Sequence, residues 1–167
     1  TRIATRKPRI RTLQLGMGWF PEKQSGLNRV YYNLLCYLTQ VGVDVKGLVA
    51  GSPEVAQTSR GSVQAFAPSA APLFKRWWAV RRMVYRTLVE DEVSLVVSHF
   101  ALYTLPVLDL VRSRPLVIHF HGPWALEGHV EKDRRLNTLV KNFVEQTVYR
   151  RGTRFIVLSH AFRDILC

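Results

Sequence analysis

The chain alternates short apolar runs with longer segments of helical periodicity, and this alternation constrains its fold more than any other feature. Strands are predicted over residues 11–16, 43–50, 62–67, 94–98, 115–120 and 154–158. Helices are predicted over residues 27–41, 73–92, 103–112, 134–151 and 161–167. Strands separated by helices pair in parallel through right-handed crossovers. The sequence therefore predicts a Rossmann-like α/β fold, with a mainly parallel sheet and helices on both faces.

The length of 167 residues and the hydrophobic content of 47% predict one ordinary core. We divide the chain into a basic extension over residues 1–10 and one domain over residues 11–167. The formal net charge is +12, because 24 Lys and Arg face 12 Asp and Glu. Such a charge attracts nucleic acid, acidic membranes or phosphorylated small molecules. The basic residues are widely spread and no nucleic-acid reading module is present, so no nucleic acid is expected.

The two cysteines, Cys36 and Cys167, have no metal-ligand neighbours, which argues against a disulfide framework or a zinc site. No stretch reaches the roughly 18 uncharged apolar residues of a spanning helix. The basic start is not followed by an apolar segment, as it would be in a secretory signal. We therefore expect a cytoplasmic protein. The last helical pattern stops without a capping residue, and we expect the chain to be a fragment.

One apolar run, residues 117–124, stops abruptly at a histidine, a glycine and a proline. Ligands collect beyond the carboxyl ends of parallel strands, so His121 beside Gly122 is a candidate site residue. We predict that His119 and His121 point to opposite faces of the sheet and do not share a site. His119 is expected to be buried with a hydrogen bond of its own.

Two further polar residues could complete this site. Glu127 either returns to the same crevice to accept hydrogen bonds from hydroxyl groups or is an exposed acid of the following loop. Ser159 follows the last predicted strand. It either contacts a ligand or caps the helix that comes next.

A second candidate lies where the first strand leads through a glycine loop into the first helix. Gly16 and Gly18 lack the third glycine of the dinucleotide fingerprint, so a nicotinamide cofactor is not expected. Ser25 and Gly26 directly precede the helix. The free N–H groups of a helix N-terminus favour a phosphate or a sugar hydroxyl, and glycine lets a ligand approach the backbone. The alternative is that this glycine only serves the turn.

The predicted helix over residues 73–92 is amphipathic, with an apolar stripe that we expect to pack on the sheet. The opposite face is basic and carries Lys75, Arg82 and Arg86, and a flank carries Phe74, Trp78 and Tyr85. The basic face and Trp78 could contact anionic headgroups or a lipid-linked phosphate acceptor. Alternatively, the face is a solvated cationic surface whose aromatic residues cover the edge of the core.

Three motifs occur in a recognisable order: MGWFPEKQSGLNRVYYNLLCYL, VIHFHGPWALEG and RFIVLSHAFRD. Over residues 11–167 the chain resembles the amino-terminal, acceptor-side domain of the GT-B glycosyltransferases of retaining family four. The resemblance implies two Rossmann-like domains that face a cleft. It also implies transfer of a sugar from a nucleotide-sugar to a glycan, lipid-linked or small hydroxyl acceptor, with retention of configuration and without a metal or other cofactor.

The resemblance also assigns roles by position. His121 would stand beside the reacting sugar, but not as a covalent nucleophile, and Gly122 would allow close approach. The loop formed by Ser25, Gly26 and Leu27 would face the donor, and Glu127 and Ser159 would shape the acceptor side. Many relatives carry a second glycine where Ser25 stands, so the donor space could be narrower here.

The second, donor-binding domain of the family is absent from this chain, which alone is therefore expected to be inactive. If the basic helix docks as described above, the protein would sit peripherally at the inner face of a membrane. The alternative function, in another class, is a non-catalytic basic α/β domain that docks on anionic membranes or polyanions.

Overall fold

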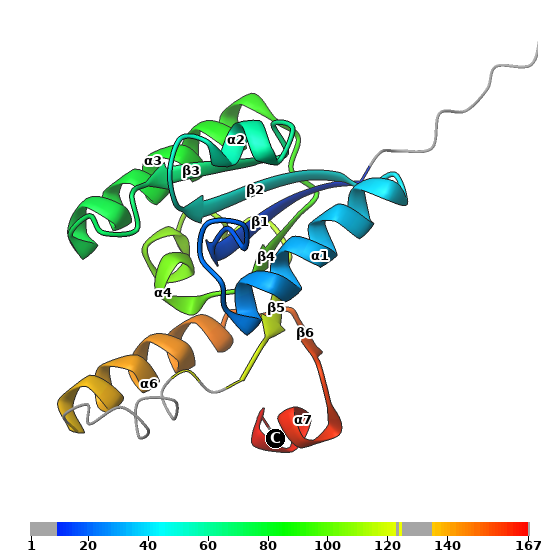
Figure 1. The fold of residues 1–167 in the computed structure, drawn as a ribbon. Helices are drawn as coiled ribbons and strands as arrows, with labels where there is room; N and C mark the ends of the chain where they lie inside the picture. Colours follow the sequence, from blue (N-terminus) through cyan, green and yellow to red (C-terminus); the bar gives the residue numbers. More distant parts are fainter. Residues whose placement is uncertain (1–9, 123, 125–134, 167) are drawn as a thin grey trace, which may run out of the picture.

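The computed structural model describes residues 10–122, 124 and 135–166, and these form one six-stranded sheet of parallel strands covered by helices (Figure 1). The strands are β1 (Arg11–Gly18), β2 (Asp44–Ala50), β3 (Val63–Ala67), β4 (Leu95–Ser98), β5 (Leu116–Phe120) and β6 (Arg154–Val157). The helices are α1 (Gly26–Gln40), α2 (Val55–Thr58), α3 (Leu73–Glu90), α4 (Ala101–Thr104), α6 (Arg135–Tyr149) and α7 (His160–Leu166), with a 3₁₀ turn, η1, at Leu105–Val107. The predicted fold class is confirmed.

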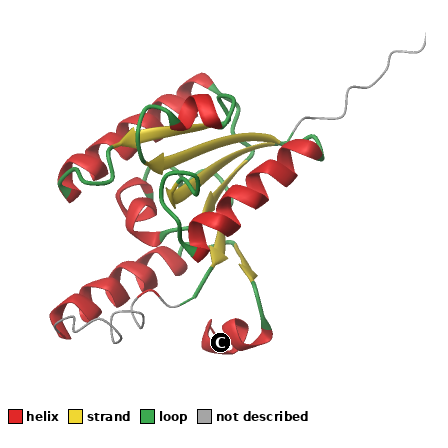
Figure 2. Ribbon diagram, viewed as in Figure 1, coloured by secondary structure: helices red, strands yellow, loops and turns green. Residues whose placement is uncertain are grey.

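Helices cover both faces of the sheet, and each face has its own core (Figure 2). In β1, Leu13 and Leu15 point into the larger core, which contains residues of α3, α4 and α6. The smaller core lies against α1 and α2 and is built around Tyr31. The alternation of side chains along each strand produces these two layers.

The strand order is β3-β2-β1-β4-β5-β6, so the direction of winding reverses between β1 and β4. Beyond the carboxyl ends of such a strand pair the connecting loops run apart and leave a crevice. The segments that follow β1, β4 and β5 all begin at this edge of the sheet. The topology therefore brings the end of β1, Gly18, together with the ends of β4 and β5, Ser98 and Phe120, which follow it by 80 and 102 residues.

Two local predictions need correction. The helix predicted over residues 103–112 is wrong, since α4 is followed by the short η1 and then by turns. Pro106 lies in η1 and has no N–H to donate, which removes a helical hydrogen bond. The short helix α2 was not predicted.

Helix α3 separates its residues into a buried and an exposed face. Val80 and Val84 are fully buried, which confirms that an apolar stripe packs inward, although Leu73 is 38% exposed. The exposed face carries Phe74, Trp78, Tyr85 and Val89, whose exposed fractions are 59–69%. These aromatic rings therefore do not cover the edge of the core, contrary to one of the two alternatives. No helix in the part of the chain that the structure describes has the length and hydropathy that crossing a membrane requires.

Candidate functional site

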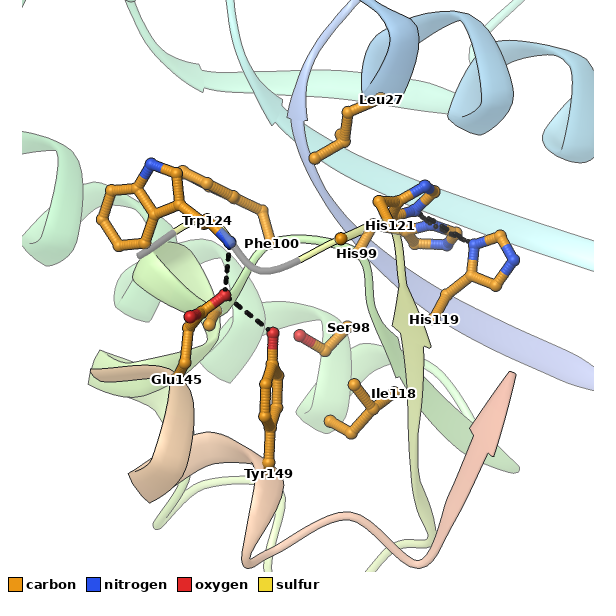
Figure 3. A pocket seen from close by; sticks show the side chains of 12 residues that line it. Leu27, Ser98, His99, Phe100, Ile118, His119, His121, Trp124, Glu145 and Tyr149 are labelled. Carbon is orange, nitrogen blue, oxygen red and sulfur yellow. Dashed lines mark hydrogen bonds between the residues drawn. The ribbon is translucent and has the colours of Figure 1, made fainter. Parts of the chain in front are cut away.

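A small cavity of about 30 Å³ lies beyond the carboxyl ends of β4 and β5 (Figure 3). It is lined by Leu27, Ser98, His99, Phe100, Ala101, Ile118, His119, His121, Gly122, Trp124, Glu145 and Tyr149. This volume is sufficient for a water molecule. The lining comes from α1, β4, α4, β5 and α6, so it combines the crevice at the strand ends with the start of the first helix.

The start of α1 supplies backbone donors near this cavity. Ser25 is the N-cap, and its Oγ accepts a hydrogen bond from the N–H of Asn28 at 3.1 Å. Among the described residues, the N–H groups of Gly26 and Leu27 have no hydrogen-bond partner, as is usual in the first turn of a helix. A Cβ atom on Gly26 would meet no atom within 4 Å. Leu27 lines the cavity, whereas Ser25 and Gly26 precede it without being part of the lining.

The earlier glycines of the loop serve packing. A Cβ atom on Gly16 would lie 2.8 Å from ring carbons of Tyr31, and one on Gly18 would lie 3.0 Å from the side-chain nitrogen of Asn28. Tyr31 is fully buried, and its hydroxyl donates to the carbonyl of Gln14 at 3.1 Å. The close approach of α1 to β1 thus accounts for the Gly-x-Gly pattern without a nucleotide.

Three histidine rings meet at the edge of the cavity (Figure 3). Nδ1 of His99, Nδ1 of His119 and Nε2 of His121 are 3.1 Å from one another in all three pairs. The prediction that His119 and His121 point to opposite faces is wrong, because residues two apart along a strand share a face. The expectation that His119 is buried and hydrogen-bonded is confirmed, since it is only 6% exposed.

His99 was not predicted as a site residue, although its position carried the necessary signal. It directly follows β4, as His121 directly follows β5, and the two strands are paired neighbours. Its Nε2 lies 2.8 Å from Oε1 of Gln14, a buried residue on the adjacent strand β1. Applying the strand-end rule to every strand would have identified His99.

Burial holds all three imidazoles in their neutral form near neutral pH. Desolvation lowers the pKa of His99 well below its usual value, and the neighbouring His119 and His121 lower it further. Burial also lowers the pKa of His119. Burial, followed by the proximity of His119, lowers the pKa of His121 to about 3. Each ring therefore offers one nitrogen lone pair.

The opposite side of the cavity is built by α6, which the sequence analysis did not connect with the site. Glu145 is 6% exposed, and one of its carboxylate oxygens accepts hydrogen bonds from the N–H of Trp124 at 2.9 Å and the hydroxyl of Tyr149 at 3.0 Å. Burial, and then the nearby Glu145 carboxylate, raise the pKa of the Tyr149 hydroxyl. An acid inside a helix pattern gives no sign in the sequence that it faces a strand end.

The remaining predicted residues are placed as follows. Gly122 lines the cavity with φ of 131°, a backbone conformation that side chains disfavour, so glycine is required there for the chain itself. Ser159 caps α7, since its Oγ accepts from the N–H of Phe162 at 3.2 Å, and it does not line the cavity. Glu127 and most of the basic extension lie outside the described residues. Lys75, Trp78, Arg82 and Arg86 lie on α3, away from the cavity lining.

Comparison with known proteins gives one family match. Residues 24–167 match the model of the family described as Glycosyltransferase Family 4. Among curated proteins, no relative matches the chain. The family match includes α1, the three histidines, α6 and α7.

Proposed function

The chain belongs to glycosyltransferase family 4, and from this premise we propose that it is the acceptor-side domain of an enzyme that transfers a hexose from a nucleotide-sugar with retention of configuration. The observation that carries the proposal is the convergence of Leu27, His121 and Gly122 on one cavity at the switch point of the sheet. Leu27 belongs to the motif at the start of the first helix, and His121 and Gly122 belong to the motif at the end of β5. A GT-B enzyme with this arrangement would hold its reacting sugar beside this cavity, since the cavity itself has room only for a water molecule.

In this proposal the N–H groups of Gly26 and Leu27 face the donor, together with Ser25 and the close backbone of Gly122. Backbone dipoles that are fixed before the reaction stabilise charge that develops on a leaving diphosphate. His121 stands beside the reacting sugar without acting as a nucleophile, and Glu127 is assigned to the acceptor side. No metal or other cofactor is assigned to the transfer itself.

The activity is tested with the complete protein and a panel of nucleotide-sugars, and the anomeric configuration of the product is determined by NMR. We expect transfer or slow donor hydrolysis with at least one donor, and a product that retains the configuration of the donor. Inversion would contradict the proposed stereochemistry. The absence of both reactions with every donor would count against the enzyme assignment. The 167 residues alone are expected to be inactive.

The role of His121 is tested by His121→Ala in the complete enzyme. With a chelator present, we expect turnover to fall by about 100-fold, the order found when one preorganised group is removed, while the melting temperature changes little. His160→Ala is the matched control, because His160 is exposed at the start of α7. A loss of folded protein in parallel with the loss of turnover would return His121 to a structural role.

We further propose that α3 docks the protein on an anionic membrane at the cytoplasmic face, where a lipid-linked acceptor would be presented. The exposed aromatic stripe of α3 lies beside its basic residues, and the guanidinium of Arg82 is 5.6 Å from the ring centre of Trp78. Exposed aromatic rings beside cations are typical of helices that lie in a membrane interface. Arg86 also pairs with Glu90 at 3.5 Å, which lessens the attraction of Arg86 for anionic lipid.

Flotation with liposomes tests this second proposal. Wild-type protein is expected to float with vesicles that contain anionic lipid. With neutral vesicles it is expected to stay at the bottom of the gradient. The triple variant Lys75→Glu/Arg82→Glu/Arg86→Glu should lose the binding, and Trp78→Ala should weaken it. Flotation that is unchanged in both variants would exclude α3 as the docking surface. Docking without any sugar transfer would favour the alternative function of a non-catalytic membrane-binding domain.

A further inference from the structure

We propose that His99, His119 and His121 form a binding site for a divalent transition-metal ion, with Zn²⁺ as the occupant. The proposal rests on the geometry of the three rings and does not depend on the transferase activity. It differs from the sequence-based expectation of no metal, which rests on the cysteines and on the resemblance.

The size of the nitrogen triangle fits a metal ion. The three inner nitrogens, Nδ1 of His99, Nδ1 of His119 and Nε2 of His121, are 3.1 Å apart on every edge. The centre of such a triangle is about 1.8 Å from each corner, since 3.1 Å divided by √3 is 1.8 Å. A zinc ion lies about 2.0–2.1 Å from imidazole nitrogen, so it fits about 1 Å above the plane of the triangle. The corresponding edge in a regular tetrahedral site is about 3.3 Å, close to the spacing found here.

Protons alone cannot satisfy the three nitrogens of the triangle. Each inner nitrogen either carries a hydrogen or presents a lone pair. With three nitrogens and two states, at least one edge joins two hydrogens or two lone pairs at 3.1 Å. Hydrogen bonds therefore leave one repulsive contact inside a buried site. A cation that accepts all three lone pairs removes that contact.

The hydrogen bond between His99 and Gln14 orients His99 as a ligand. Oε1 of Gln14 can only accept a hydrogen bond, so Nε2 of His99 at 2.8 Å carries the proton and the lone pair is on Nδ1. The orientation of the Gln14 amide is supported by its Nε2, which donates to Oγ1 of Thr12 at 3.0 Å. A ligating histidine usually donates its other ring N–H in this way.

The composition of the site decides the class of metal. Three neutral imidazoles suit zinc, copper or nickel and are poor ligands for Mg²⁺, which prefers oxygen. The adjoining cavity of about 30 Å³ leaves room for a water molecule as a fourth ligand. Coordination through Nε2 of His121 would place that ring's proton on Nδ1, a buried atom with no hydrogen-bond partner among the described residues.

Metal binding is tested directly on the chain after treatment with a chelator. The exposed thiol of Cys36, together with Cys167, is first replaced by serine so that thiols do not bind the metal. Calorimetric titration with Zn²⁺ is expected to give one ion per chain and a raised melting temperature, and titration with Mg²⁺ to give neither. Co²⁺ should develop the intense visible absorption of a four-coordinate site. If Zn²⁺ does not bind, or if Co²⁺ shows only the weak absorption of a six-coordinate ion, the proposal is wrong.

Variants locate the ion. His99→Gln, His119→Gln and His121→Gln should each lower the zinc affinity by about 100-fold or more, whereas His160→Gln should leave it unchanged. Gln14→Leu keeps all three ligands and should lower the affinity by about 10–100-fold, as the loss of a hydrogen-bond partner of a ligating histidine does. Binding that is equal in all these variants would place the ion elsewhere and overturn the assignment.

A measurement on the wild-type chain keeps the proposal testable even if a ligand variant does not fold. In a chain labelled with ¹⁵N at histidine, Zn²⁺ should shift the signals of Nδ1 of His99, Nδ1 of His119 and Nε2 of His121. Shifts confined to other histidines would contradict the site. These experiments contain no nucleotide-sugar, so their failure and a failure of the proposed transfer are separate results.

Discussion

At the scale of single residues, the glycines of the first loop look alike in the sequence and differ in their surroundings. Gly16 is in contact with the Tyr31 ring, while Gly26 has open space where a Cβ atom would be. One position is therefore limited by packing, and the other can accept a side chain without a clash. Gly26 would therefore be important only if its backbone faces a ligand.

Gly16→Ala is expected to destabilise the chain by about 1–3 kcal/mol, because the buried Tyr31 must move to admit the methyl group. Gly26→Ala is the matched control and should change the free energy of unfolding by less than about 0.5 kcal/mol. Urea unfolding followed by circular dichroism measures both values. Equal values for the two variants would contradict the packing account. In the complete enzyme, Gly26→Ala should nevertheless weaken donor binding if the proposed function is right.

The buried histidines make a prediction about acid stability. Their pKa values in the folded chain are lowered, to about 3 for His121, while the unfolded value is about 6.5. Below pH 6.5 the unfolded chain therefore binds protons that the folded chain does not. In the presence of a chelator, the free energy of unfolding should fall as the pH decreases from 6.5 toward 3, by up to about 1.4 kcal/mol per pH unit for each histidine.

Denaturant unfolding between pH 7.5 and pH 4.5 measures this slope, and His121→Gln provides the comparison. The variant should show a shallower decrease, because one of the three proton-binding groups of the unfolded chain is missing. If the variant and the wild type have the same slope, His121 is protonated as easily in the folded chain as in solution.

At the scale of elements, α3 shows how one helix serves two surfaces. Val84 is fully buried against the sheet, and Val89 is 68% exposed on the stripe with Trp78. The amphipathic pattern in the sequence distinguishes these faces only in part, because the exposed stripe is also apolar. An apolar stripe left exposed beside basic residues needs a partner or a function to account for it.

Val84→Ala should lower the free energy of unfolding by about 2 kcal/mol, through lost apolar burial and the cavity left behind. The same substitution at the exposed position, Val89→Ala, should change it by less than about 0.5 kcal/mol. Thermal or urea unfolding of the two variants checks this difference. A large loss for Val89→Ala would show that its side of α3 is covered in the folded protein.

At the scale of the whole molecule, the charge of +12 acts together with the local patch on α3. Reversing Lys75, Arg82 and Arg86 lowers the net charge from +12 to +6, because each reversal changes it by two. The remaining charge still attracts anionic surfaces over distances limited by the Debye length of about 10 Å at 0.1 M salt. The contribution of the overall charge to membrane binding can therefore be separated from that of the α3 surface.

A vesicle co-sedimentation assay at two salt concentrations should separate the overall charge contribution from the contribution of α3. At about 0.02 M salt, the triple reversal variant is expected to retain part of its binding to anionic vesicles, and at about 0.3 M salt it should lose the rest. Wild-type protein should keep more of its binding at the higher salt because the aromatic stripe contributes apolar contacts that salt does not screen. If both proteins lose binding at the same salt concentration, the aromatic residues of α3 do not take part.

The sequence by itself determined the layers of this protein. Short apolar runs that alternate with helices of period 3.6 were sufficient to predict all six strands and the parallel fold, since both signals are local. Local signals also identified His121 beside Gly122 and the start of α1 as site candidates. The expected helix over residues 103–112 failed at Pro106, a local signal that the periodic pattern obscured.

Only the tertiary structure decided which residues meet. Gln14, His99 and Glu145 lie on three different elements, and their proximity to the cavity follows from the strand order and from the packing of α6. No local pattern contains that information, because contacts between distant segments depend on which strands become neighbours. The same reason explains the histidine triangle: His119 and His121 lie two residues apart at the end of β5, and His99 follows the neighbouring strand β4, 20 residues before His119.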